Sequence, residues 1–178
     1  MKQTLQNHYQ NIIIYNLLTK LNLTNRFELP QITKICLNLG FKNANIEKKK
    51  LINIILLLKL ITNQKPKITK SKKNNLFLKI KKNSITGCKL TLRKKNMFIF
   101  LEKICLFLVP NLNQIKFNLK TTNILNFQII NILDMFELKT EFLKFKNIPV
   151  IDISIHTNAK NTNEFFLLLN SFFIIQNK

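Results

Sequence analysis

The sequence predicts an α+β fold: an antiparallel sheet with helices packed on one face and a polar, basic open face. Runs of apolar residues at helical spacing predict the helices, and runs that alternate apolar with polar residues predict the strands. The chain has 178 residues, of which 46% are hydrophobic. That is enough for one core, so we expect a single domain over residues 1–178.

Four segments have the apolar pattern of helices. Residues 6–21 repeat apolar side chains at intervals of three and four, which is typical of an amphipathic helix. Residues 46–61 and 97–108 are apolar almost all round, which predicts helices buried against the sheet. Residues 164–170 predict a short final helix.

Four other segments alternate with period two, which is typical of strands with one buried face. They are residues 32–39, 77–82, 86–93 and 150–157. The apolar members, which we expect to face the helices, are Ile35, Leu37, Leu39, Leu78, Ile80, Cys88, Leu90, Leu92, Ile151, Ile153 and Ile155. The intervening residues are mostly Lys, Thr, Asn and Ser, so the open face is predicted to be polar and basic.

The positive charge is concentrated in the first half of the chain. The net charge is +21, and residues 1–95 hold 21 Lys and Arg against 2 acids. Residues 96–178 hold 8 against 6, whereas residues 65–95 hold twelve basic residues and no acid. Self-repulsion on this scale predicts a polyanionic partner. A solvated surface is the alternative interpretation of such a run.

The open strand face and the basic run supply the candidate RNA contacts. Lysines are suited to phosphates, whereas Thr, Asn and Gln can bond sugars and base edges. The predicted RNA-binding residues are Lys34, Asn38, Gln64, Lys65, Lys67, Thr69, Lys70, Lys72, Lys73, Lys89, Thr91 and Arg93. Most of the 15 Phe occupy apolar positions, which favours recognition of a folded RNA over stacking on splayed bases.

Signals for catalysis, cofactors, metals and membranes are weak. The chain has 2 His, 8 scattered carboxylates and 2 Gly, so no catalytic cluster, metal-spaced cluster or phosphate-binding glycine loop can be assigned. Asp134, Glu137 and Glu141 can share a helix face, but a solvated face explains them as well. The three Cys form no C-x-x-C pair, and the apolar run 51–58 is too short to span a bilayer.

Five motifs occur in one order: "LPQITKICLNLGFKNA" (29–44), "ITNQKPKITKSKKN" (61–74), "TGCKLTLRKKNMFIFLEKI" (86–104), "VPNL" (109–112) and "IDISIHTNAKN" (151–161). In this order and spacing the chain resembles the universal ribosomal protein L-five family of the large subunit. The usage of Lys, Asn, Ile, Leu and Phe indicates an A+T-rich gene. Together these favour an organelle-encoded copy in the mitochondrion, with the plastid as the alternative.

The resemblance implies that the sheet binds 5S ribosomal RNA and nearby large-subunit RNA in the central protuberance. It also implies contacts with neighbouring central-protuberance proteins, with small-subunit protein S-thirteen, and with transfer RNA in the P site. The segment that matches the tRNA-facing loop contains Lys81, Lys82, Asn83 and Ser84. No cofactor, metal or membrane partner is implied.

The chain departs from the family pattern at three places, one of which is the loop "KKNSITG", where only one of two usual glycines is kept. Asn63 stands where the family usually has Gly, and residues 113–147 contain no Gly where the family has a Gly-rich loop. The alternative function is an organelle RNA-binding or RNA-processing protein outside the ribosome. An RNA enzyme would need paired acids, and a membrane-surface protein would need lysines opposite an apolar helix face.

Overall fold

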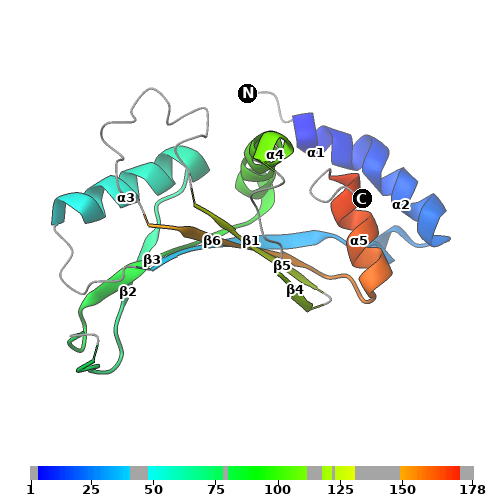
Figure 1. The fold of residues 1–178 in the computed structure, drawn as a ribbon. Helices are drawn as coiled ribbons and strands as arrows, with labels where there is room; N and C mark the ends of the chain where they lie inside the picture. Colours follow the sequence, from blue (N-terminus) through cyan, green and yellow to red (C-terminus); the bar gives the residue numbers. More distant parts are fainter. Residues whose placement is uncertain are drawn as a thin grey trace. The chain divides into compact units, whose positions relative to one another are not determined.

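The computed structural model describes residues 4–40, 48–77, 80–111, 118–121, 123–130 and 149–172 (Figure 1). In chain order the elements are α1 (Thr4–His8), η1 (Tyr9–Ile13), α2 (Ile14–Leu21), η2 (Arg26–Glu28), β1 (Ile32–Gly40), α3 (Lys48–Thr62), β2 (Lys67–Lys70), β3 (Ile85–Leu92), α4 (Lys94–Asn111), β4 (Asn118–Thr121), β5 (Ile124–Ile129), β6 (Ile151–Thr157) and α5 (Thr162–Ser171). The strands form a sheet of order β2-β3-β1-β6-β5-β4. The predicted α+β fold with an antiparallel sheet is confirmed.

Two compact units divide the chain, and the boundary between them falls within strands. Unit 1 comprises Met1–Ile35, Leu92–Asn126 and Ser154–Lys178, whereas unit 2 comprises Cys36–Thr91 and Phe127–Ile153. Each unit is described by itself below. A single domain over residues 1–178 stays a prediction.

Unit 1 contains an N-terminal helical segment that confirms the helix predicted over residues 6–21. α1 and α2 are joined through one π-helical stretch, η1, in which Tyr9 and Ile13 are buried. The Tyr9 ring stacks on Phe172 with centroids 5.5 Å apart, and it lies tilted against Phe98 at 5.7 Å. These three side chains form the aromatic cluster of unit 1.

The other helices of unit 1 complete its core. α4 buries Phe100, Leu101 and Ile104, and α5 buries Phe165, Leu168 and Leu169. Both helices were predicted, although α4 begins three residues earlier than expected and ends three residues later. Cys105 donates its thiol proton to the carbonyl oxygen of Phe172 at 3.2 Å. Burial, helped by the charge of Glu102, raises the pKa of this thiol to about 12, so Cys105 stays neutral.

Unit 2 packs α3 on one face of its strands (Figure 1). The buried side of α3 carries Ile54, Leu57, Leu58 and Ile61. The other side of the helix is also apolar but faces solvent, since Ile52, Leu56 and Leu60 are 46–54% exposed. The helix expected over residues 46–61 and buried against the sheet is thus confirmed, as α3 over residues 48–62, although its opposite apolar side is exposed.

The strand registers follow the predicted alternation in β1, β3 and β6. The buried members are Ile35, Leu37, Leu39, Cys88, Leu90, Leu92, Ile151, Ile153 and Ile155. The strand predicted over residues 77–82 is wrong. Residues 78 and 79 lie outside the described residues, Ile80 forms only an isolated bridge with Asn75, and a turn follows.

Four described residues adopt a left-handed backbone without being glycine: Asn22 (φ 50°), Asn63 (φ 55°), Asn83 (φ 65°) and Lys94 (φ 50°). Neither of the chain's two glycines has a positive φ. Gly87 is required for a different reason. A Cβ at this position would overlap the Leu39 carbonyl oxygen, so β3 can approach β1 this closely only with glycine here.

Candidate nucleic-acid interface

The exposed faces of β1 and β3 in unit 2 carry polar side chains between buried apolar ones. Asn38 is exposed between the buried Leu37 and Leu39, and Lys89 and Thr91 are exposed on either side of the buried Leu90. Alternation therefore directs these three polar side chains away from the core that α3 covers. Asn38, Lys89 and Thr91 are thus exposed to solvent, whereas their role in an RNA-binding face stays a prediction.

β2 adds lysines to this open face through its pairing with β3. The register sets Lys67 directly opposite Lys89, and both side chains are exposed. Directly opposite residues have Cβ atoms about 5 Å apart, and like charges in such a pair are destabilising. The register then shifts: Thr69 lies opposite Gly87 and Lys70 opposite Ile85, so Thr86 on β3 is the extra residue of a bulge. The sequence did not predict this like-charged pair, because β2 itself was not predicted.

The segment between α3 and β2 directs the first lysines. Asn63 ends α3 in a left-handed conformation and donates its N–H to the Lys59 carbonyl oxygen at 2.8 Å. A left-handed conformation favours glycine, and asparagine is one of the few other residues that adopt it readily. Pro66 is buried, whereas Lys65 and Lys67 on either side of it are exposed. The buried proline therefore anchors a segment whose lysines face solvent.

Gln64 has a structural contact that sequence reasoning did not predict. Its side-chain amide donates from Nε2 to the carbonyl oxygen of Thr91 at 3.3 Å, and its backbone N–H donates to Thr62 at 3.4 Å. Gln64 thereby connects the end of α3 to β3. The Thr91 hydroxyl in turn lies 3.9 Å from the sulfur of Cys36 on β1. An RNA contact by Gln64 is thus left to its amide oxygen and the second N–H of its side-chain amide.

Beyond β2 and β3 the described residues 71–77 and 80–84 form a hydrogen-bonded hairpin. Ser71 donates to the Ser84 carbonyl oxygen at 2.9 Å, and Asn83 donates to the Ser71 carbonyl oxygen at 3.0 Å. The exposed lysines of this hairpin are Lys72, Lys73, Lys81 and Lys82. The Ser84 hydroxyl instead donates to the Lys81 carbonyl oxygen at 2.7 Å. Of the predicted tRNA-facing residues, Ser84 therefore shapes the loop, while Lys81, Lys82 and Asn83 are exposed.

Two predicted contacts lie in unit 1. Lys34 is half-buried on β1, and Arg93 is exposed directly after β3. His156 on β6 is influenced by Lys34: burial lowers the pKa of His156 below its ordinary value, and the positive charge of Lys34 lowers it further. The Thr33 hydroxyl donates to the His156 carbonyl oxygen at 3.1 Å. The lowered pKa keeps the His156 side chain neutral at neutral pH.

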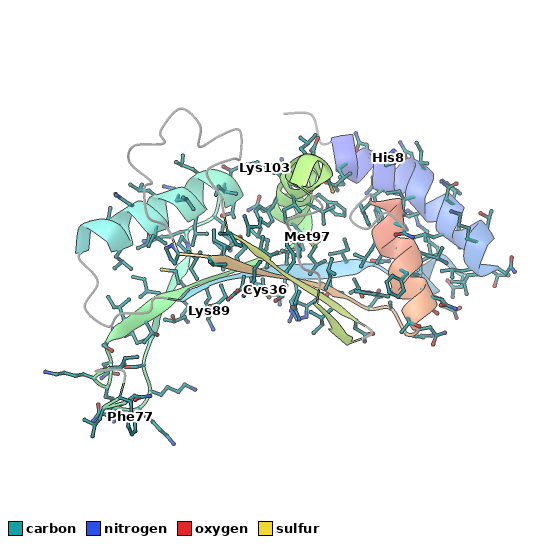
Figure 2. The ribbon with its side chains drawn as sticks, viewed as in Figure 1. His8, Cys36, Phe77, Lys89, Met97 and Lys103 are labelled. Carbon is teal, nitrogen blue, oxygen red and sulfur yellow. The ribbon has the colours of Figure 1, made fainter. Side chains whose placement is uncertain are left out.

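The structure shows two exposed residues that sequence reasoning missed. Leu76 is 90% exposed and Phe77 is 99% exposed, and both lie in the hairpin between the lysines (Figure 2). The alternation around them suggested a strand with a buried face. The available signal was their position, since an apolar pair inside a lysine-rich segment has no neighbouring core to enter.

The described part of the chain does not meet the requirements of a metal site or of a membrane-spanning helix. No group of three His, Cys, Asp or Glu that could hold a metal ion occurs there. No helix within the described ranges is long and apolar enough to cross a bilayer. Asp134, Glu137 and Glu141 lie outside the described residues.

Comparisons with known proteins identify relatives of the chain. A family model described as "Ribosomal protein L5" matches residues 25–81. The chain is 35% identical over 178 residues to the large ribosomal subunit protein uL5m of Reclinomonas americana, covering 98% of both chains. It is 32% identical over 172 residues to uL5 of Buchnera aphidicola subsp. Schizaphis graminum, with 95% of this chain and 96% of the relative covered.

A third relative, uL5 of Ehrlichia chaffeensis, is 34% identical over 173 residues, with 94% of this chain and 96% of the relative covered. These alignments extend over almost the whole chain and so include both compact units. At these identities and coverages, with the predicted motifs in order, the chain belongs to the ribosomal protein L5 family.

Proposed function

We propose that this chain binds ribosomal RNA through the exposed faces of β1 and β3 and through the lysines of β2 and the hairpin. As an L5 family member it is a structural protein of the large ribosomal subunit, and the family is not an enzyme family. It is a protein of the mitochondrial ribosome, as its similarity to uL5m of Reclinomonas americana supports. The plastid alternative gains no support from these relatives.

The observation that carries the proposal is the cross-strand pair of Lys67 and Lys89. Two lysines opposite each other on an exposed face weaken the folded state of the free protein. Phosphates bound between them would reverse the sign of that interaction, because each phosphate attracts both ammonium groups. Asn38 and Thr91 on the neighbouring positions can then bond sugars or base edges. This combination suits RNA better than a merely solvated surface.

The family membership also supports finer assignments, which we propose for this chain. The RNA on the open face is 5S ribosomal RNA, where the ribosome has one, together with nearby large-subunit RNA. Lys81, Lys82 and Asn83 approach transfer RNA in the P site. Lys34 and Arg93 are RNA contacts of unit 1. The remaining partners are small-subunit protein S-thirteen and the neighbouring proteins of the central protuberance.

Filter binding of the full chain to 5S and large-subunit RNA fragments, across a salt series, tests the RNA assignment. Each phosphate contact contributes roughly 0.7–0.9 to the slope of log affinity against log salt concentration. Replacing Lys67, Lys70 and Lys72 with Gln should flatten that slope by about two. Comparing the two RNA classes shows which of them the face binds.

A matched variant controls for net charge. Lys20, Lys59 and Lys160 are also exposed but lie outside the open face. Their triple replacement by Gln removes the same charge and should leave the slope almost unchanged, since direct contacts dominate it. Equal slopes in the two triple variants would reject the assignment of the lysines on β2 and the hairpin as phosphate contacts.

A further inference from the structure

The tip of the hairpin carries an apolar pair that folding alone does not explain. Phe77 is 99% exposed and Leu76 is 90% exposed, and Figure 2 shows Phe77 at the far end of the hairpin. An exposed ring of this size gains nothing from the core and remains in contact with water. Its position is therefore informative about a partner rather than about stability.

The hairpin holds this pair on a built support. Asn75 and Ile80 exchange both backbone hydrogen bonds at 2.9 Å, directly beside Leu76 and Phe77. On the side of this pair nearer to β2 and β3, Asn74 Oδ1 accepts a hydrogen bond from the Lys82 backbone N–H at 2.6 Å. Asn83 adopts its left-handed conformation where the chain returns to β3. Leu76 and Phe77 thus project from a hairpin held by hydrogen bonds, so less conformational entropy is lost when a partner binds.

The charge around the tip decides between classes of partner. Lys72, Lys73, Lys81 and Lys82 are all exposed in the same hairpin. An apolar protein pocket would have to accept or exclude four positive charges when it takes up the ring. RNA matches both features, because its phosphates attract lysines and its base faces are apolar and flat.

We propose that Phe77, with Leu76 beside it, stacks on the face of an RNA base against which no neighbouring base is stacked. The inference rests on the proposed function, because the same hairpin is proposed to approach transfer RNA. The lysines then hold the backbone, and the ring supplies a contact that tolerates any base. The uncovered base belongs either to the ribosomal RNA or to transfer RNA, and the experiment distinguishes these sources. Although the other phenylalanines predict no stacking platform, this one residue provides a stacking surface.

The absence of tryptophan from the chain makes a direct test possible. A Phe77→Trp variant carries one indole, whose fluorescence is quenched when it stacks on a base. Phe27, which is 91% exposed in unit 1, gives the matched control as Phe27→Trp. Extracted large-subunit RNA is added to each full-length variant, and bulk transfer RNA is added afterwards. Quenching of the Trp at position 77 alone supports stacking, and the step at which it occurs identifies the RNA.

Affinity measurements separate this inference from the proposed function. Phe77→Ala should weaken RNA binding about five- to one-hundred-fold while leaving the salt slope unchanged, because no charge is removed. Phe77→Tyr should restore most of the affinity, since the ring is kept. If the wild-type chain binds RNA with a steep salt slope but the Trp at position 77 is not quenched, the stacking proposal is wrong and the proposed function stands.

Two further outcomes also overturn the stacking proposal. A blue shift of the Trp at position 77 that requires other large-subunit proteins, without quenching by RNA, would assign the tip to a protein pocket. Failure of the wild-type chain to bind either RNA would reject the stacking proposal and the proposed function together.

Discussion

The aromatic cluster of unit 1 and the hairpin of unit 2 use the same residue type in opposite ways. Tyr9, Phe98 and Phe172 pack ring against ring at 5.5–5.7 Å, and Tyr9 and Phe172 are buried. Phe77 in the hairpin is 99% exposed. Lys67, on the strand β2 that leads into the hairpin, lies opposite Lys89. The ring contacts of the cluster are formed by folding itself, whereas the Phe77 ring of the hairpin remains in contact with water.

This difference separates residues that stabilise the fold from residues that, in our proposal, contact RNA. A buried ring contributes to the free energy of folding through the surface it removes from water. An exposed ring and a like-charged pair contribute nothing or weaken the fold. Equivalent substitutions in the two regions should therefore change different measurements, namely stability in unit 1 and RNA affinity in the hairpin.

The largest expected effect compares the same substitution in both regions. Phe100→Ala removes a ring that is 1% exposed in the core of unit 1, and it should lower the free energy of unfolding by about 3–5 kcal/mol. Phe77→Ala should change it by less than about 0.5 kcal/mol, as is usual for surface sites. Urea unfolding of the free proteins measures both. Comparable losses would show that the hairpin ring serves the fold after all.

The second prediction concerns the close approach of β3 to β1 at Gly87. Gly87→Ala places a methyl group against the Leu39 carbonyl oxygen, so it should destabilise the free protein by about 3 kcal/mol. A methyl group on Gly40 would meet nothing within 4 Å, and Gly40→Ala should stabilise the protein by about 0.5 kcal/mol. Thermal unfolding of the pair measures the difference. Equal melting temperatures would contradict the close approach of β3 to β1.

The smallest expected effect is a gain in the stability of the free protein when charge repulsion is relieved. Lys67→Gln relieves the repulsion with Lys89 and should stabilise the free protein by roughly 0.2–1 kcal/mol at low salt. The gain should fall at about 1 M salt, where exposed charges are screened. Lys65→Gln, just before β2, should show no such gain. RNA affinity should decrease in Lys67→Gln although its stability rises. A loss of stability would mean that Lys67 has a structural role.

Much of the fold was predictable because one face of most elements is buried. Burial imposes period two on β1, β3 and β6 and helical spacing on α2, and these periods are visible in the sequence. β2 was missed because both of its faces are partly open: Lys67 and Lys70 are exposed, and Ile68 is 37% exposed. β4 was also missed. β5 alternates the buried Leu125, Phe127 and Ile129 with more exposed residues, so it had a usable signal.

The site was predictable in composition but not in geometry. The acid-free run identified the lysines of β2 and the hairpin, and strand alternation placed Asn38 and Thr91 on the open face. The pairing of Lys67 with Lys89 depends on a register between segments about 20 residues apart, which local sequence does not encode. The strand predicted over residues 77–82 was wrong because period two indicates a buried face only where a core exists to receive it, and the exposure of Phe77 in the hairpin was not predicted.

The left-handed asparagines have a consequence for the chain before it folds. Asn22, Asn63 and Asn83 occupy backbone conformations in which glycine would be less strained. Glycine would also give the unfolded chain more accessible backbone states. With only 2 glycines in 178 residues, the denatured ensemble is narrower, and less conformational entropy is lost when the native turns form. A nascent chain carrying a charge of +21 thus begins folding with a smaller entropic barrier, before any RNA neutralises it.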